Sequence, residues 1–253
     1  MRRRGIRGGD SPSRSSLERR SDDDGSDGGC GHWREDGRRS PGRQEPLGAF
    51  HPPCVVLIDP RAATSLSDRD FRAGLVEAFK ATWIADGELA RRAERALSRI
   101  LARDEESLLD LLGGAVRVKV SIVSSDPRES GERRLLNFGH TLGHALEAAG
   151  GYRDLRHGEA VAWGIAAALE LSVRRCGLVP EAADSIRGVL ARLGPFPPPC
   201  RDPRTLAGFL ERDKKATARG IAAVLLESIG RARIEEAVPA EEWLAAAAIM
   251  SLK

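Results

Sequence analysis

Three of the five histidines in this 253-residue chain stand close together, at positions 140, 144 and 157. His140 and His144 are four residues apart, so on a helix their imidazole rings would share one face. Neutral imidazole is the commonest protein ligand of metals, and a helical pair with a third histidine nearby is typical of a metal site. The pair alone has a second interpretation, in which both rings lie on a helix surface or in a core and bond backbone carbonyls.

A carboxylate further upstream is a candidate for the same site. Glu77 lies between Leu75 and Phe79, inside the apolar face of a helical pattern. A carboxylate buried there needs a partner, either a cation or a metal. Lys80 could supply the cation, and a simple salt bridge is then the alternative to a metal. Two imidazole nitrogens and one carboxylate oxygen would leave one coordination position open, as in catalytic zinc sites.

The elements that must position these residues are mostly helices. Apolar residues spaced three or four apart predict helices over Asp70–Ile84, Glu88–Ala102, Glu105–Ser124, Leu135–Ala149, His157–Arg175, Pro180–Leu193, Arg204–Arg212 and Glu241–Ile249. The segments Ile221–Leu226 and Ala232–Ala237, joined across Ile229-Gly230, are typical of a β-hairpin. Cys54–Ile58, ended by Asp59-Pro60, is typical of one buried strand. We therefore expect a mainly α domain with an entrance strand and a small hairpin.

The composition of the chain excludes several kinds of binding partner and cellular location. The formal charge is only +3, and the arginine runs at 2–4 and 38–39 sit among acidic residues, so we expect no nucleic-acid partner. The four cysteines are far apart and form no CxxC pair, which favours reduced thiols in a cytoplasm over disulfides or a cysteine-based zinc site. No apolar run reaches the roughly 18 residues that a membrane helix needs. We expect a cytoplasmic protein without a membrane partner.

Three segments resemble signatures of the 3-dehydroquinate synthase family, in the family's order. They are GLVEAFK at 74–80, LLNFGHTLGHALEA at 135–148 and HGEAVAWG at 157–164. GAFHPPCVVLIDP at 48–60 resembles the stretch that leads out of the family's nucleotide-binding domain. The resemblance implies the helical C-terminal domain of the dehydroquinate synthase-like fold over residues 61–253, which binds metal and substrate, and a remnant of the nucleotide-binding domain over 47–60.

The resemblance also implies roles for residues. The metal ligands would be Glu77, His140 and His157, and Zn²⁺ or Co²⁺ would suit them. The residues at the family's catalytic positions are Lys80, Arg133, Asn137 and His144. The remaining substrate contacts would come from Lys119, Lys214 and Lys215, and the DKK segment at 213–215 does not tell which of its two lysines makes contact. For Lys119, a solvated position at the edge of a helix is an equal alternative.

The implied reaction is the cyclisation of 3-deoxy-arabino-heptulosonate 7-phosphate to 3-dehydroquinate, with phosphate elimination, in the shikimate pathway. Such a phosphorylated sugar acid needs several cations, and Arg133 could bind its phosphate or carboxylate through two hydrogen bonds. The implied assembly is a homodimer. The alternatives are another sugar-phosphate cyclase, a related polyol dehydrogenase and a metal-binding remnant without catalysis. The dehydrogenases usually have Asp where Glu77 stands.

The first 46 residues are mostly Gly, Ser, Arg and Asp, and such a composition predicts a disordered tail. A second hypothesis is that the coding frame is shifted here. Reading Ser21–Pro46 one base later permits a family-like run that includes GGKTG, from the family's nucleotide-binding domain. The resemblance implies NAD as a cofactor, and we expect its domain to be missing from this chain and the chain alone to turn over no substrate.

Overall fold

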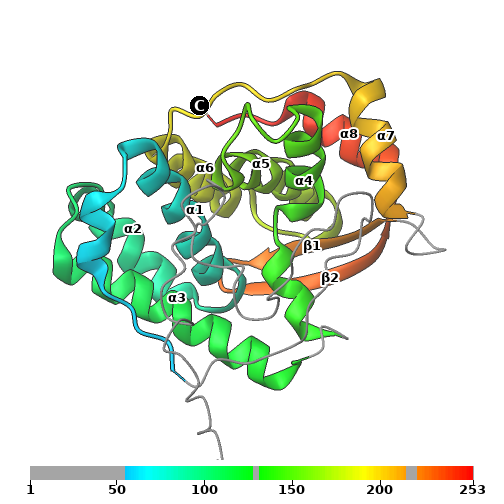
Figure 1. Cartoon of the computed structure of the whole chain (residues 1–253). Coiled ribbons are helices and arrows are strands. Elements are labelled where there is room, and N and C mark those ends of the chain that lie inside the picture. Colours follow the sequence, from blue (N-terminus) through cyan, green and yellow to red (C-terminus); the bar gives the residue numbers. More distant parts are fainter. Residues whose placement is uncertain (1–54, 128–130, 215–220, 253) are drawn as a thin grey trace, which may run out of the picture.

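A computed structural model describes residues 55–127, 131–214 and 221–252, without side-chain detail for 211–214 (Figure 1). The proposed segment 1–46, residues 47–54 and Lys215 lie outside the described residues. Helices dominate the described part, and two antiparallel strands form a hairpin. None of the described helices combines the length and the apolar character required to cross a membrane.

The helical predictions are confirmed to within two residues at nearly every end. The described α-helices are α1 (Asp68–Ala85), α2 (Gly87–Leu101), α3 (Glu105–Ser125), α4 (His140–Ala149), α5 (His157–Cys176), α6 (Pro180–Leu193), α7 (Pro203–Lys214) and α8 (Ala240–Ile249). The 3-10 helices are η1 (Pro60–Ser65) and η2 (Glu132–Asn137), and the strands are β1 (Ile221–Ser228) and β2 (Arg231–Val238).

One predicted helix, Leu135–Ala149, is wrong in its first third. The chain forms η2 up to Asn137 and then breaks, because Gly139 has a φ of 79° and no right-handed helix can pass through that conformation. The α-helix begins afresh at His140. The break places His140 at the first position of a helix rather than in its middle.

The predicted entrance strand is also wrong over its described part. Residues 55–58 form no strand, and their side chains are exposed, with 91% of Leu57 accessible. A strand needs a neighbouring strand to satisfy its backbone groups. Among the described residues only β1 and β2 pair with each other, and neither pairs with this segment.

Helix α5 is the centre of the fold. All residues from Gly158 to Leu169 are buried, as expected of a helix that is apolar on every side. It packs against α1, α4, α6, α8 and β1. In Figure 1 the hairpin runs beneath α5, with α2 and α3 at one end of the molecule and α7 and α8 at the other.

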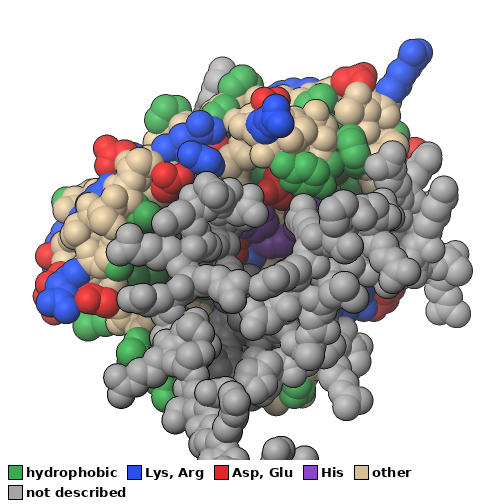
Figure 2. Space-filling model, viewed as in Figure 1, with side chains coloured by type: hydrophobic (Ala, Val, Ile, Leu, Met, Phe, Trp, Pro, Cys, Tyr) green, Lys and Arg blue, Asp and Glu red, His purple; other side chains and the backbone are tan. Residues whose placement is uncertain are grey.

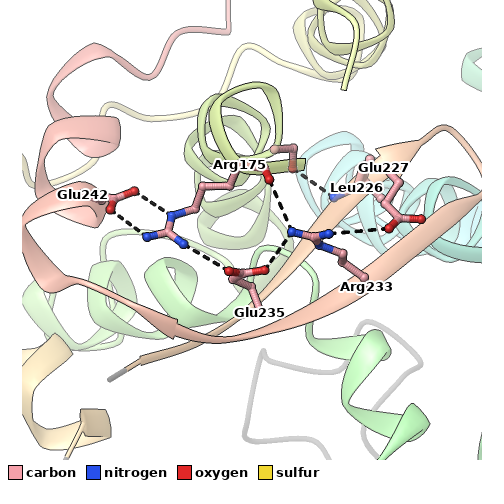
Figure 3. A network of polar contacts seen from close by, with 7 residues as sticks. Arg175, Leu226, Glu227, Arg233, Glu235 and Glu242 are labelled. Carbon is pink, nitrogen blue, oxygen red and sulfur yellow. Dashed lines mark hydrogen bonds and ion pairs between the residues drawn. The ribbon is translucent and has the colours of Figure 1, made fainter. Parts of the chain in front are cut away.

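A polar network fixes the C-terminal end of α5 to the hairpin and to α8 (Figure 3). Arg175 donates to both carboxylate oxygens of Glu242, each at 2.8 Å, and to Glu235 at 3.1 Å. Arg233 donates to the carbonyl oxygen of Arg175 at 3.3 Å, and the backbone N–H of Leu226 donates to the Ser172 hydroxyl at 2.9 Å. His157 stands at the N-terminal end of α5, so the helix that positions this histidine is anchored at its C-terminal end.

Candidate metal centre

Glu77 is held on the buried face of α1. The helix begins at Asp68, where the hydroxyl of Ser67 accepts the N–H of Asp70 at 3.1 Å and so caps the first turn. From there the helical repeat turns Glu77 inward, and only 4% of the residue is exposed. Its neighbour Lys80 is buried beside it, with Nζ 2.7 Å from Oε2 of Glu77. The salt bridge proposed from the sequence is therefore present.

Helices α4 and α5 bring the two histidines to this carboxylate because glycines let them approach closely. A Cβ atom added to Gly164 would lie well inside van der Waals contact with the carbonyl oxygen of Gly139. A Cβ on Gly158 would collide in the same way with the carbonyl of Ala73 on α1. The glycines of the HGEAVAWG segment thus set the spacing of α5 from α4 and α1.

Three donor atoms converge between these helices. Oε1 of Glu77 lies 4.0 Å from Nε2 of His140 and 3.9 Å from Nε2 of His157, and the three residues offer one ligand atom each within 4.8 Å of one another. These separations are too long for hydrogen bonds. Two ligand atoms that each lie about 2.0–2.2 Å from one tetrahedral zinc ion are about 3.3–3.6 Å apart, so these atoms would have to draw together by only about 0.5 Å to bind one. The histidines gather at one place on the face shown in Figure 2.

The electrostatics put two of the three groups in the form that binds a metal. Burial raises the pKa of Glu77, but the charges of Lys80 and the two histidines lower it more, to about 2. Burial and the Lys80 ammonium group hold the pKa of His140 well below its usual range. Burial lowers the pKa of His157, yet its bond to Glu147 and the charge of Glu77 leave it raised. At neutral pH Glu77 is therefore an anion and His140 a neutral base.

The donor set fits a divalent metal. Oε1 of Glu77 is buried and accepts no hydrogen bond from the described residues, which is costly unless a cation faces it. The Nδ1 atoms of both histidines face acceptors, the carbonyl oxygen of Phe138 at 3.3 Å and Oε1 of Glu147 at 3.2 Å. Each ring can therefore direct the lone pair of Nε2 toward Glu77. Two nitrogens and one oxygen suit Zn²⁺ or Co²⁺.

The structure places Lys80 and His144 beside these three ligands. Lys80 contacts Glu77 directly, and the ring of His144, which is exposed, lies 5.2 Å from that of His140 and 6.1 Å from that of His157. Lys119 lies on α3, and Arg133 and Asn137 lie on η2, which packs against both α3 and α1. Lys214 is the last residue of α7, and its side chain lies outside the described part of the structure. Lys215 lies wholly outside it.

Two residues that support the site were not predicted from the sequence. The side chain of Glu159 is only 2% exposed and accepts a hydrogen bond from the backbone N–H of Arg156 at 2.8 Å. This bond caps the N-terminus of α5, whose first residue is His157. Arg69 on α1 donates two hydrogen bonds to the same carboxylate, at 2.6 and 2.7 Å. The N-terminus of α5 is thus bound to the helix that carries Glu77. Glu159 stands in the HGE segment, but nothing in the sequence indicated Arg69, 90 residues away.

Arg69→Ala should lower the free energy of unfolding by about 1–3 kcal/mol, because it takes a charged donor from a buried carboxylate. Arg61→Ala is the matched control, since Arg61 pairs with the exposed Asp59 and an exposed ion pair contributes little to stability. Urea unfolding followed by circular dichroism measures both. Equal costs for the two variants would contradict the proposed tie between α1 and α5.

The comparisons with known proteins agree with one another. A family model described as 3-dehydroquinate synthase C-terminal matches residues 74–216. The 3-dehydroquinate synthases of Thermosynechococcus vestitus and Nitrosomonas europaea are 42% and 39% identical over 199 and 194 residues, or 77% and 76% of this chain. These matches cover 54% and 53% of the relatives, so the chain spans about half the length of the curated relatives it matches.

A solved structure supports the same fold. The 2-epi-5-epi-valiolone synthase of Streptomyces hygroscopicus subsp. jinggangensis 5008, solved with NAD⁺ and Zn²⁺ bound, superimposes with a TM-score of 0.71 at 28% identity. The match covers 81% of this chain and 57% of that one. Fold, matched segments and sequence identity all lead to one assignment. The chain belongs to the 3-dehydroquinate synthase family and corresponds to its C-terminal domain.

Proposed function

We propose that this domain binds Zn²⁺ or Co²⁺ and a phosphorylated sugar acid as part of a 3-dehydroquinate synthase. The reaction would be the cyclisation of 3-deoxy-arabino-heptulosonate 7-phosphate to 3-dehydroquinate with loss of phosphate. The observation that carries the proposal is the convergence of Glu77 Oε1 with Nε2 of His140 and of His157. The relatives' identity of about two residues in five supports the choice of product. We also propose that the working assembly is a homodimer, as the family resemblance implies.

When bound, the metal would supply Lewis-acid polarisation of substrate oxygens, and NAD⁺ would supply hydride transfer. The residues of this chain bind and orient the substrate. Arg133 has a planar guanidinium group that suits a carboxylate or a phosphate, and Lys119 adds a positive charge. His144 carries an exposed imidazole beside the metal ligands, and an imidazole can accept or donate a proton near neutral pH. Lys80 keeps Glu77 ionised and in place.

A second candidate function is a sugar-phosphate cyclase with another product. The superposition on a valiolone synthase favours it, since the two proteins share the fold. The lower identity of that protein, 28% against 42%, ranks it behind the dehydroquinate enzyme. A cyclase whose substrate lacks a carboxylate would differ from the dehydroquinate enzyme in the ligand it prefers, and this preference can be measured without turnover.

Calorimetry of the Zn²⁺-loaded chain with two ligands tests the proposal. One ligand is the heptulosonate 7-phosphate, and the other is a heptulose 7-phosphate that lacks the carboxylate. We expect the acid to bind at least about tenfold more tightly, because a hydrogen bond to a charged group contributes about 1.5–3 kcal/mol. Equal affinity would favour the other cyclase. Binding of neither ligand with zinc present would favour a metal-binding remnant.

A further inference from the structure

The ring of His157 lies between two carboxylates, and only one of them belongs to the ligand triad. Its Nε2 faces Oε1 of Glu77 at 3.9 Å, and its Nδ1 lies 3.2 Å from Oε1 of Glu147. The first contact is too long for a hydrogen bond, while the second lies at the outer limit of one. Glu147 is 13% exposed at its side chain and comes from α4, whereas His157 begins α5. The contact therefore joins two different helices.

The two histidines of the triad differ in what holds their rings. His140 has the carbonyl oxygen of Phe138 as an acceptor for Nδ1–H, supplied by the backbone just before α4. His157 has no such backbone acceptor among the contacts of the described residues, and its side chain is 24% exposed, against 13% for His140. The more exposed ring depends on a side chain from another helix. That side chain is Glu147.

We infer that Glu147 is a positioning residue for the metal centre, accepting Nδ1–H of His157 so that the lone pair of Nε2 faces Glu77. A carboxylate in this place fixes the tautomer, orients the ring and makes the imidazole a stronger base toward a metal. The inference rests on the metal centre of the proposed function. It adds a residue that lies outside the ligand triad.

An alternative arrangement uses the same atoms differently. His144, Glu147 and His157 have donor atoms within 4.8 Å of one another and could hold a second ion. That ion would need Nδ1 of His157 to lose its proton while Nε2 served the first ion. It would also place two divalent cations on opposite sides of one ring. A single hydrogen bond from Nδ1 satisfies the same contact without removing that proton, and so we favour the positioning role.

Titration of the full chain with Co²⁺ and Zn²⁺ tests the inference through three variants. Glu147→Ala should weaken binding about 10–100-fold, the usual cost of losing an outer partner of a ligand, and should alter the visible absorption of bound Co²⁺. Glu147→Gln keeps an acceptor oxygen and should recover most of the affinity. Glu88→Ala removes an exposed carboxylate on α2 and should change nothing. Thermal unfolding in a chelator shows whether each variant folds.

The outcomes separate the claims. Wild-type metal affinity in Glu147→Ala would overturn the inference. A variant that loses stability without metal, but keeps the affinity and the Co²⁺ spectrum of the wild type, would also overturn it, because that pattern indicates a purely structural role. Two Co²⁺ equivalents in the wild type, with one lost in Glu147→Ala, would make Glu147 a ligand instead. A wild-type chain that bound no Co²⁺ or Zn²⁺ would refute the metal centre itself, and the role of Glu147 with it.

Discussion

Glu77→Gln should abolish binding of Zn²⁺ at concentrations that saturate the wild-type chain. The amide keeps the size of the side chain but removes the anion that faces both histidine Nε2 atoms. Losing an outer partner of a ligand costs up to about 100-fold in affinity, and losing a ligand itself should cost more. Competition with a chromophoric chelator gives the dissociation constant.

Folding has to be measured beside metal binding in this variant. The substitution leaves the buried ammonium group of Lys80 without its anion at 2.7 Å, and breaking a buried ion pair is destabilising. Binding is therefore compared at a temperature where circular dichroism shows both proteins folded. His144→Ala is the matched control, because it removes an imidazole one turn from His140 but outside the triad. Equal losses in the two variants would contradict the assignment of Glu77 as a ligand.

The second large effect concerns the contact of α4 with α5. Gly164→Ala should lower the free energy of unfolding by about 1–3 kcal/mol, the usual cost of overpacking a core. The new methyl group would collide with the Gly139 carbonyl and lie 2.9 Å from the backbone nitrogen of Gly143, and neither neighbour is a flexible side chain. Moving α5 away from α4 also separates His157 from His140, so the affinity for zinc should fall with the stability.

The same substitution on α6 should have the opposite sign. Gly188 is exposed inside that helix, and a Cβ added there meets no atom within 4 Å. Gly188→Ala should therefore stabilise the chain by about 0.5–1 kcal/mol, because alanine has less conformational freedom to lose. Chemical denaturation of both variants supplies the comparison. Stabilisation by Gly164→Ala would show that the two helices do not approach as described.

Most helices could be predicted because their signals are local. The ends of α6 follow from Pro180 and from Gly194 directly after Leu193, and α5 follows from a long alanine-rich apolar segment. The position of the break before α4 could not be predicted from such local signals. It depends on Gly139 adopting a positive φ, and glycine is also tolerated inside helices. A Cβ atom added at Gly139 would also collide with Ile165 of α5, so tertiary packing as well as the positive φ requires glycine here.

The three metal ligands could be proposed from the sequence, but the residues that hold these ligands in position could not. His140 and His157 drew attention by their type, and Glu77 by its place in an apolar face. Arg69 and Glu147 have no such mark, since an arginine or a glutamate on a helix is usually solvated. Their roles follow from contacts between helices, such as that of Glu147 with His157. Such contacts depend on tertiary packing, which periodicity does not encode.

Anomalous diffraction at the zinc absorption edge, from crystals of the chain grown with Zn²⁺, tests the central claim most directly. We expect one strong peak per chain, about 2.0–2.2 Å from a carboxylate oxygen of Glu77 and from Nε2 of both His140 and His157. A peak bound by His144 and Glu147 without Glu77, or no peak between α1, α4 and α5, would contradict the proposed metal centre.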